Sequence, residues 1–210
     1  MANSIRQDVH DECFDFNKGL MADVPQKNIF SQHTNIFSIL TDAVPVEKQK
    51  EIMKKVLEDE SLIQTTIYYK FYLFQALKKA GMANIYLEQL GPWHDMLAKG
   101  LSTWEEGDYD ERSDCHAWGS SPLYDLFATV CGIRSSSPGF KTVHIEPAFG
   151  PLLKVTAEMP HPMGEIILNL ERKGENGLKG EILLPEELEG KFSWKNQVIN
   201  LIPGTNYINY

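Results

Sequence analysis

The apolar positions of the first 134 residues recur with a helical period and predict six helices of two kinds. Residues 46–57 and 83–98 are amphipathic, and the polar segment 2–12 is a further outer helix. Gly91-Pro92 is expected to kink or end the second of these helices early. The other three helices are expected at 30–40, 65–80 and 115–131. They are apolar on most sides, so other elements must cover them all round.

The period changes to short β-type runs after Ser135-Ser136-Ser137-Pro138-Gly139, which we interpret as a hinge between domains. Gly174-Glu175-Asn176-Gly177 is expected to be a hairpin loop. Several strands at short, regular spacing indicate an antiparallel β-sandwich. The strands are expected at 141–147, 152–158, 164–172, 178–184, 191–194 and 197–201.

These two patterns predict an α+β multidomain protein, with a helical domain at residues 1–134 and a β-sandwich at residues 135–210. Alternating covered and amphipathic helices with short connections are typical of helical hairpins stacked in a ring or a layer. If the covered helices run parallel inside a ring, their N-terminal ends share one rim. The sequence places polar or aromatic residues at each of those ends.

Composition excludes several classes of function. The formal net charge of −9 over 210 residues leaves no basic face for nucleic acid. No apolar run approaches the roughly 20 residues that cross a bilayer, and the first residues lack the apolar core of a signal peptide. Cys13, Cys115 and Cys131 match neither a disulfide framework nor a zinc site, so reduced thiols and no metal cofactor are expected.

The rim residues form a candidate ligand site. His33 lies at the start of one covered helix, Tyr68 near the start of the next, and His116 at the start of the third. The loop that carries Trp104 and Glu105 leads to the same rim. Polar and aromatic groups that converge on the mouth of an apolar ring are typical of a binding pocket.

Each of these residues also has an ordinary structural interpretation. From spacing alone, Glu105 is more simply a surface carboxylate, and His33 and His116 are helix-start or core histidines. Tyr68 fits a core position. Asp114 is a candidate cap for the helix expected at 115–131.

Two other site types are disfavoured. Residues 108–114, DYDERSD, alternate acids at first but lack the turn glycine and distal glutamate of a calcium-binding EF-hand loop. Asp108, Asp110 and Glu111 are therefore expected to be solvated loop acids. A nucleophilic Cys115–His116 pair is weaker still, because neighbouring residues on a helix do not face each other.

An ordered series of motifs resembles the end of the catalytic domain of bacterial α-L-rhamnosidases and the strand that leads into their terminal sandwich. The series covers nearly the whole chain when the segments upstream and downstream are included, and its order is more specific than any single motif. The motifs are Thr103-Trp104-Glu105, Ser113-Asp114-Cys115-His116-Ala117, Gly132-Ile133, Pro138-Gly139-Phe140 and Val143-His144-Ile145-Glu146-Pro147.

The resemblance implies an (α/α)6 barrel followed by a β-sandwich, with only the last half of the barrel in this chain. It implies that Glu105 is the general base of an inverting glycosidase and that His116 contacts the sugar. Trp104 and Trp118 would wall the pocket. The general acid of the family lies in an Asp/Glu-rich segment early in the barrel, and no such segment is found in this sequence.

Three functions follow as expectations. The first is a glycoside hydrolase segment for terminal α-L-rhamnose that is inactive or very weak alone, since leaving-group protonation is commonly worth ~10²–10⁴-fold in rate. The second is a non-catalytic sugar-binding or assembly module, and the third is a folded remnant without a ligand. The expected partners are a rhamnose-containing carbohydrate and either a second copy or the missing barrel half, which would cover the apolar faces of a half-ring.

Overall fold

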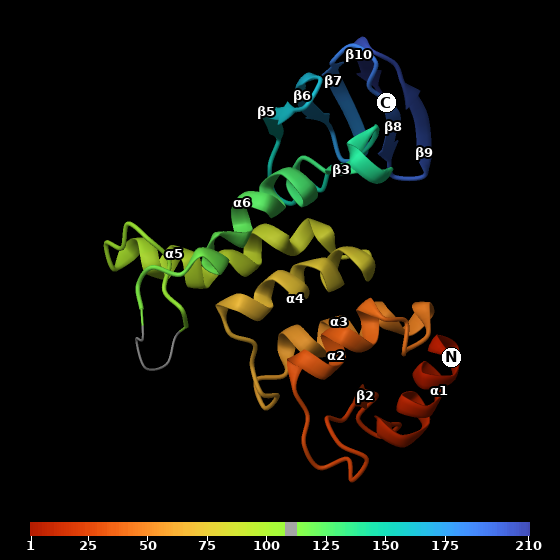
Figure 1. The fold of residues 1–210 in the computed structure, drawn as a ribbon, viewed down its shortest axis with the longest axis vertical. Helices are drawn as coiled ribbons and strands as arrows, with labels where there is room; N and C mark the ends of the chain where they lie inside the picture. The colour runs from red at the N-terminus through yellow and green to blue at the C-terminus, as the bar shows by residue number, and fades with distance from the viewer. Residues whose placement is uncertain (108–112) are drawn as a thin grey trace. The chain divides into compact units, whose positions relative to one another are not determined.

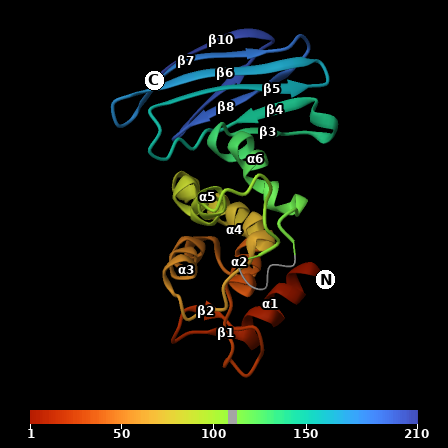
Figure 2. The ribbon, with the colours of Figure 1, turned by 90° about the vertical axis from the view of Figure 1, so that its left-hand side faces the viewer.

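The computed structural model describes residues 1–107 and 113–210, which form a mixed helix-and-sheet fold of two compact units. The first unit is Met1–Pro122 and the second is Leu123–Tyr210 (Figures 1 and 2). The helical unit comes first in the chain and the sheet unit second, as the sequence patterns predict.

The helical unit is built around α2 (Gln32–Leu40), which packs against α3 (Val46–Glu58) and α4 (Ile67–Lys79). The 3₁₀ helix η1 (Ala83–Leu90) packs on α4 and on α5 (Gly91–Ala98), so the chain changes helix type at Gly91-Pro92, where a break was expected. The outer helix α1 (Ala2–Cys13) buries none of its side chains. The fully buried apolar side chains of this unit come mainly from α2, α3 and α4, among them Ile36, Ile39, Met53, Phe74 and Leu77.

Buried amides fix the position of α2. Gln32 donates from Nε2 to the Val56 carbonyl at 2.8 Å and accepts at Oε1 from the backbone and hydroxyl of Thr65, each at 2.9 Å. Asn35 accepts at Oδ1 from the Met21 amide at 2.9 Å and donates from Nδ2 to the Met21 carbonyl at 3.0 Å. Since a buried amide without partners is costly, these bonds tie α2 to the chain segments on both of its sides.

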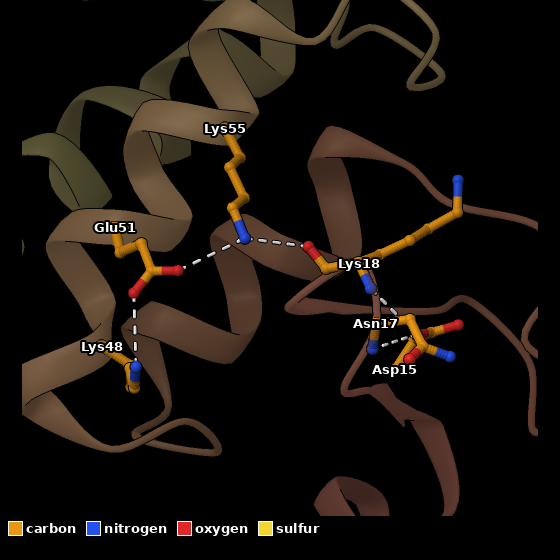
Figure 3. A network of polar contacts seen from close by, with 6 residues as sticks. All are labelled: Asp15, Asn17, Lys18, Lys48, Glu51 and Lys55. Atoms are coloured by element: carbon orange, nitrogen blue, oxygen red, sulfur yellow. Dashed lines mark hydrogen bonds and ion pairs between the residues drawn. The ribbon is translucent and has the colours of Figure 1, made fainter.

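A short hairpin, β1 (Phe14–Asp15) and β2 (Leu20–Met21), was not predicted from the sequence. Lys55 of α3 holds its turn, because its ammonium lies 3.3 Å from Glu51 Oε1 and donates to the Lys18 carbonyl at 2.9 Å (Figure 3). The turn bends through Gly19 at φ 64°, and a Cβ there would approach Lys55 Nζ to 2.6 Å. Strands of two residues are too short to show a period of two in the sequence.

The single helix expected at 115–131 is wrong. Residues 115 and 116 are not helical, and the segment is divided into the 3₁₀ turn η2 (Ala117–Ser120), α6 (Ser121–Asp125) and the π-turn η3 (Leu126–Val130). The expected cap at Asp114 is also wrong, since His116 occupies the N-cap of η2 in extended conformation and no side chain caps it.

The sheet unit contains two four-stranded sheets. One has the order β10-β7-β6-β5 and the other β3-β4-β8-β9. The strands are β3 (Ile133–Ser135), β4 (Thr142–Ile145), β5 (Lys154–His161), β6 (Gly164–Lys173), β7 (Gly177–Leu184), β8 (Glu189–Trp194), β9 (Gln197–Leu201) and β10 (Gly204–Asn209).

Alternating burial gives each sheet one apolar face. On β6, Ile166, Leu168 and Leu170 are fully buried while the residues between them are not. The loop at 174–176 joins β6 to β7 as a hairpin, as expected. Trp194 of β8 donates from its indole nitrogen to the Asn176 carbonyl at 2.9 Å, which links the two sheets.

Three features of the sheet unit differ from the sequence interpretation. The compact units divide after Pro122 rather than after Arg134, because η3 packs against β3 and β5. The serine-rich segment 135–139 therefore connects β3 to β4 within the unit, and it is not the junction between the units. Strand pairing is antiparallel except for β4 and β8, which pair in parallel, so a purely antiparallel arrangement is wrong.

Candidate functional site

The loop that follows α5 is closed on itself by backbone hydrogen bonds. The Glu106 amide donates to the Ser113 carbonyl and the His116 amide donates to the Trp104 carbonyl, both at 2.9 Å. The Thr103 hydroxyl donates to the Asp114 carbonyl. These bonds bring residues 104–106 beside residues 113–116, so motifs that are separate in the sequence form one site.

Glu105 is buried in this loop, with 3% of the residue exposed, and is not the surface carboxylate that its spacing favours. Its Oε1 accepts a hydrogen bond from Lys99 Nζ at 2.9 Å, and its Oε2 lies 3.3 Å from the same nitrogen. Lys99 caps the C-terminal end of α5, and its side chain is 55% exposed. A buried carboxylate needs such a partner, because removing an unpaired charge from water is costly.

The next residue, Glu106, has a different neighbour. Its Oε2 lies 3.8 Å from Nε2 of His116, and the two side chains are 19% and 25% exposed. Nδ1 of His116 is buried and has no hydrogen-bond partner among the described residues. The acid that faces His116 is thus Glu106, whereas Glu105 faces Lys99.

Aromatic rings connect the predicted site residues in a continuous series. The His116 ring lies 4.4 Å from the ring of Trp118, and Trp118 lies 5.4 Å from Tyr68. Tyr68 lies 5.3 Å from Tyr69, which lies 4.4 Å from His33. The last three of these pairs are edge-to-face, an arrangement that adds attraction beyond the buried area, and the His116–Trp118 pair is tilted. α2, α4 and η2 therefore each contribute rings to one surface.

A hollow of about 310 Å³ lies beside these rings. Tyr68 and Trp118 line its wall and are each 41% exposed, so part of each residue is accessible to a ligand. It is lined by Tyr68, Phe71, Tyr72, Ala117, Trp118, Ser120 and Ser121. Such a hollow offers flat apolar surface with a few hydroxyls, which suits a ligand with one apolar face.

Two titratable groups of this surface are perturbed. Burial lowers the pKa of His33, and the nearby Asp23 carboxylate opposes that effect. A hydrogen bond with Tyr68 raises the pKa of Tyr72. His33 therefore favours its neutral form, in which its ring packs against Tyr69 without the cost of a partly desolvated charge.

Comparisons with known proteins give the site its context. Residues 132–197 match the family model for the bacterial alpha-L-rhamnosidase C-terminal domain. The resemblance to the C-terminal part of bacterial α-L-rhamnosidases is thereby confirmed. No curated protein sequence matches the chain.

Solved rhamnosidase structures share the fold. A GH78 family rhamnosidase of Bacillus sp. GL1 matches 92% of this chain with a TM-score of 0.79 at 21% identity, over 22% of its own length. The α-L-rhamnosidase of Dictyoglomus thermophilum matches 99% with a TM-score of 0.78 at 20% identity, over 28% of its length. That of Aspergillus terreus matches 99% with a TM-score of 0.80 at 15% identity, over 26% of its length. This chain thus spans about a quarter of each enzyme that it resembles.

The structure places the predicted site residues in two groups. His116, Trp118, Tyr68 and His33 lie along the aromatic surface. Trp104 contributes its carbonyl to the loop and packs its side chain against Gly119, where a Cβ would overlap the indole side chain. Glu105 is buried in the loop and paired with Lys99.

Sequence reasoning missed several residues of the site. Lys99 and Glu106 gave no signal, because a charged residue after a helix and a second acid in an acidic run are ordinary surface features. Tyr69 and Tyr72 fitted core positions, although the turn spacing of Tyr68 and Tyr72 on one helix face was a usable signal. The calcium candidate at 108–114, with Asp108, Asp110 and Glu111, falls largely outside the described residues.

Within the described ranges 1–107 and 113–210, no three His, Cys, Asp or Glu side chains are grouped closely enough to hold a metal ion. All three cysteines are free thiols, with Cys115 exposed and Cys131 buried. Among the same residues, no helix is both long and apolar enough to span a bilayer.

Proposed function

We propose that this chain is the C-terminal portion of a glycoside hydrolase that removes terminal α-L-rhamnosyl groups with inversion at the anomeric carbon. The observation that carries the proposal is the family match at residues 132–197, which directly follows the site loop and the aromatic surface in the chain. The likeness of fold to rhamnosidases over more than nine-tenths of the chain supports it.

In this proposal Glu105 is the general base. An inverting glycosidase needs a carboxylate that takes a proton from water as the water attacks the anomeric carbon, and an acid that protonates the leaving oxygen. Lys99 now occupies both oxygens of Glu105, so the long, half-exposed Lys99 side chain is the group that must move for a water to reach them. His116, Trp104, Trp118, His33 and Tyr68 are proposed to hold the sugar.

The architecture of the whole enzyme is part of the proposal. We propose that the helices of residues 1–134 complete an (α/α)6 barrel with a further barrel half, and that the two sheets form its terminal β-sandwich. The general acid is assigned to that further half or, in its absence, to no residue of this chain. Partly exposed apolar residues such as Phe37, Leu97 and Trp118 support a partner surface, which a second copy would also cover.

The test combines binding with turnover on the chain as it stands. Nuclear magnetic resonance titration with L-rhamnose is expected to shift the His116 and Trp118 resonances, and Tyr68→Ala is expected to weaken binding. Tyr207→Ala is the matched control, since Tyr207 lies on the sheet unit and is 80% exposed. An aryl α-L-rhamnoside is expected to show at most trace hydrolysis. Robust hydrolysis that survives Glu105→Gln would overturn the assignment of the base.

A second candidate is a sugar-binding or assembly module without hydrolase activity. The burial of Glu105 beneath Lys99 favours it, because a base without access to water cannot act. The two functions separate when the chain is combined with the N-terminal remainder of a rhamnosidase. Hydrolysis that appears on mixing and disappears with Glu105→Gln supports the hydrolase, and rhamnose binding that never leads to hydrolysis supports the module.

A further inference from the structure

Strand β5 forms an open edge of the sheet ordered β10-β7-β6-β5. It pairs with β6 on one side, and no other described strand pairs with its far side (Figure 2). The Arg172 amide donates to the Leu153 carbonyl at 2.8 Å, in the same register as the β5–β6 pair. Since hydrogen-bonded residues alternate along an antiparallel pair, the amides and carbonyls of Lys154, Thr156 and Glu158 point away from β6. These backbone groups can pair with a further strand.

Pro160 ends this free edge. It is the next position of β5 whose backbone points away from β6, and proline has no amide to donate. Proline and lysine on an edge strand discourage pairing with arbitrary strands. A strand that pairs with β5 must therefore need no amide at Pro160 and must neutralise the charges beside it.

The outer face of β5 is complementary in charge to a second copy of itself. Lys154, Thr156 and Glu158 are exposed and alternate with more buried residues, so their side chains lie on one face. Within the described part of the chain, the side chains of Lys154 and Glu158 have no hydrogen-bond or ion-pair partner. When two β5 strands pair antiparallel about a twofold axis at Thr156, each Lys154 lies opposite the other copy's Glu158. Opposite charges attract across such a pair, whereas an axis at Lys154 or at Glu158 would place like charges opposite each other.

An apolar hollow of about 500 Å³ lies beside the same edge, within the sheet unit. Besides residues 154–158 it is lined by Leu123, Leu126, Phe127, Val130, Cys131 and Leu152. Leu123 is 65% exposed and Leu126 is 41% exposed. Because the hollow follows residues 154–158, a twofold axis at Thr156 brings the hollows of both copies together, and their leucines are removed from water.

We propose that the chain forms a symmetric dimer through β5, in which the β10-β7-β6-β5 sheets of two copies join into one sheet across a twofold axis at Thr156. Thr156 exchanges both backbone hydrogen bonds with its counterpart, and Lys154 exchanges both with Glu158 of the other copy. The same patch serves both copies, so the association closes at a dimer. This inference goes beyond the proposed function and does not depend on it.

The first test measures the dissociation constant of the dimer by sedimentation equilibrium of the full chain. Thr156→Pro removes the amide at the axis from both copies and leaves the β5–β6 pairing intact, because that amide points outward. The dimer should weaken roughly ten- to hundredfold, the range for losing the hydrogen bonds at the axis. A wild type that stays monomeric up to about 1 mM, or a dimer that tolerates Thr156→Pro, overturns the inference.

Thr205→Pro is the matched control for the first test. Thr205 is exposed and lies on β10, the opposite edge strand of the same sheet. Its backbone points away from β7, since the Tyr210 amide donates to the Leu178 carbonyl in the register of that pair. Thr205→Pro should therefore leave the dimer unchanged, and equal weakening by both proline variants overturns the inference.

The second test exchanges charges at the register that the inference requires. Lys154→Glu and Glu158→Lys each place like charges opposite each other, so each should weaken the dimer about tenfold. The double variant restores opposite charges and should associate like the wild type. A mixture of the two single variants should form heterodimers, because one copy then carries only acids at these positions and the other only lysines. Single variants that associate like the wild type, or a mixture that forms no heterodimer, overturn the inference. These exposed substitutions also serve if Thr156→Pro does not fold.

Discussion

Replacing Lys99 by Met is expected to lower the free energy of unfolding of the helical unit by about 2 kcal/mol. Breaking a buried ion pair by removing one partner costs about 3–5 kcal/mol, and breaking an exposed pair costs about 0–1 kcal/mol. The Glu105 side chain is 4% exposed and that of Lys99 is 55% exposed, so the pair lies midway between these limits. Met keeps the length and the apolar stem of lysine, so the substitution removes mainly the ammonium group.

Urea denaturation followed by tryptophan fluorescence measures this change, because Trp93, Trp104 and Trp118 all lie in the helical unit. Lys99→Arg retains the charge and should restore most of the stability. In a Glu105→Gln background, Lys99→Met should cost less than in the wild type, since the buried carboxylate that the ammonium neutralises is gone. The reasoning is refuted if Lys99→Met costs the same in both backgrounds, or if it costs nothing in the wild type.

Three further experiments test other parts of the structure: a pair of glycine substitutions, the labelling of cysteines, and the dependence of stability on pH. Gly119→Ala should destabilise the helical unit by about 1–3 kcal/mol, because the added Cβ overlaps a neighbouring indole side chain. At Gly91 the backbone is helical and an added Cβ meets open space, so Gly91→Ala should be neutral or stabilise by up to about 1 kcal/mol. Equal urea midpoints for the two variants would contradict the close contact between Gly119 and Trp104. At pH 8 a disulfide reagent should label the exposed Cys115 rapidly and Cys131 only on unfolding, because burial raises the pKa of Cys131 to about 11; equal labelling rates would count against its burial. Hydrogen bonds from Lys55 and then Lys48 lower the pKa of Glu51 below its usual 4.5, so the stability that they provide is present above that pH and is lost as the pH falls below it. The urea midpoint should therefore fall more between pH 6 and pH 3 in the wild type than in Glu51→Gln, and parallel falls would refute this account.

Local patterns were enough to place most of the secondary structure. The helix expected at 46–57 is α3 at Val46–Glu58, because a strongly amphipathic stripe leaves one orientation against the core. The strands expected at 164–172 and 178–184 are β6 and β7, since alternation and a glycine-bounded loop fix a hairpin.

The segment 115–131 shows where local patterns fail. Its apolar residues favour a continuous helix, but the His116 amide bonds to the Trp104 carbonyl and keeps this end of the segment extended. A contact between residues that are twelve positions apart is not visible in a local period. The parallel pairing of β4 with β8 was hidden for the same reason, since it joins distant strands.

For the candidate site, the sequence by itself indicated some of the residues. The helix starts and the motif order indicated Tyr68, His116 and Trp118, and the structure places these three rings in series. Only the tertiary structure decided which acid faces which partner. Glu105 and Glu106 are identical side chains in adjacent positions, and local propensity cannot separate them. Backbone hydrogen bonds from Glu106 to Ser113 and from His116 to Trp104 close the loop, and in the closed loop Glu105 contacts Lys99 while Glu106 lies beside His116.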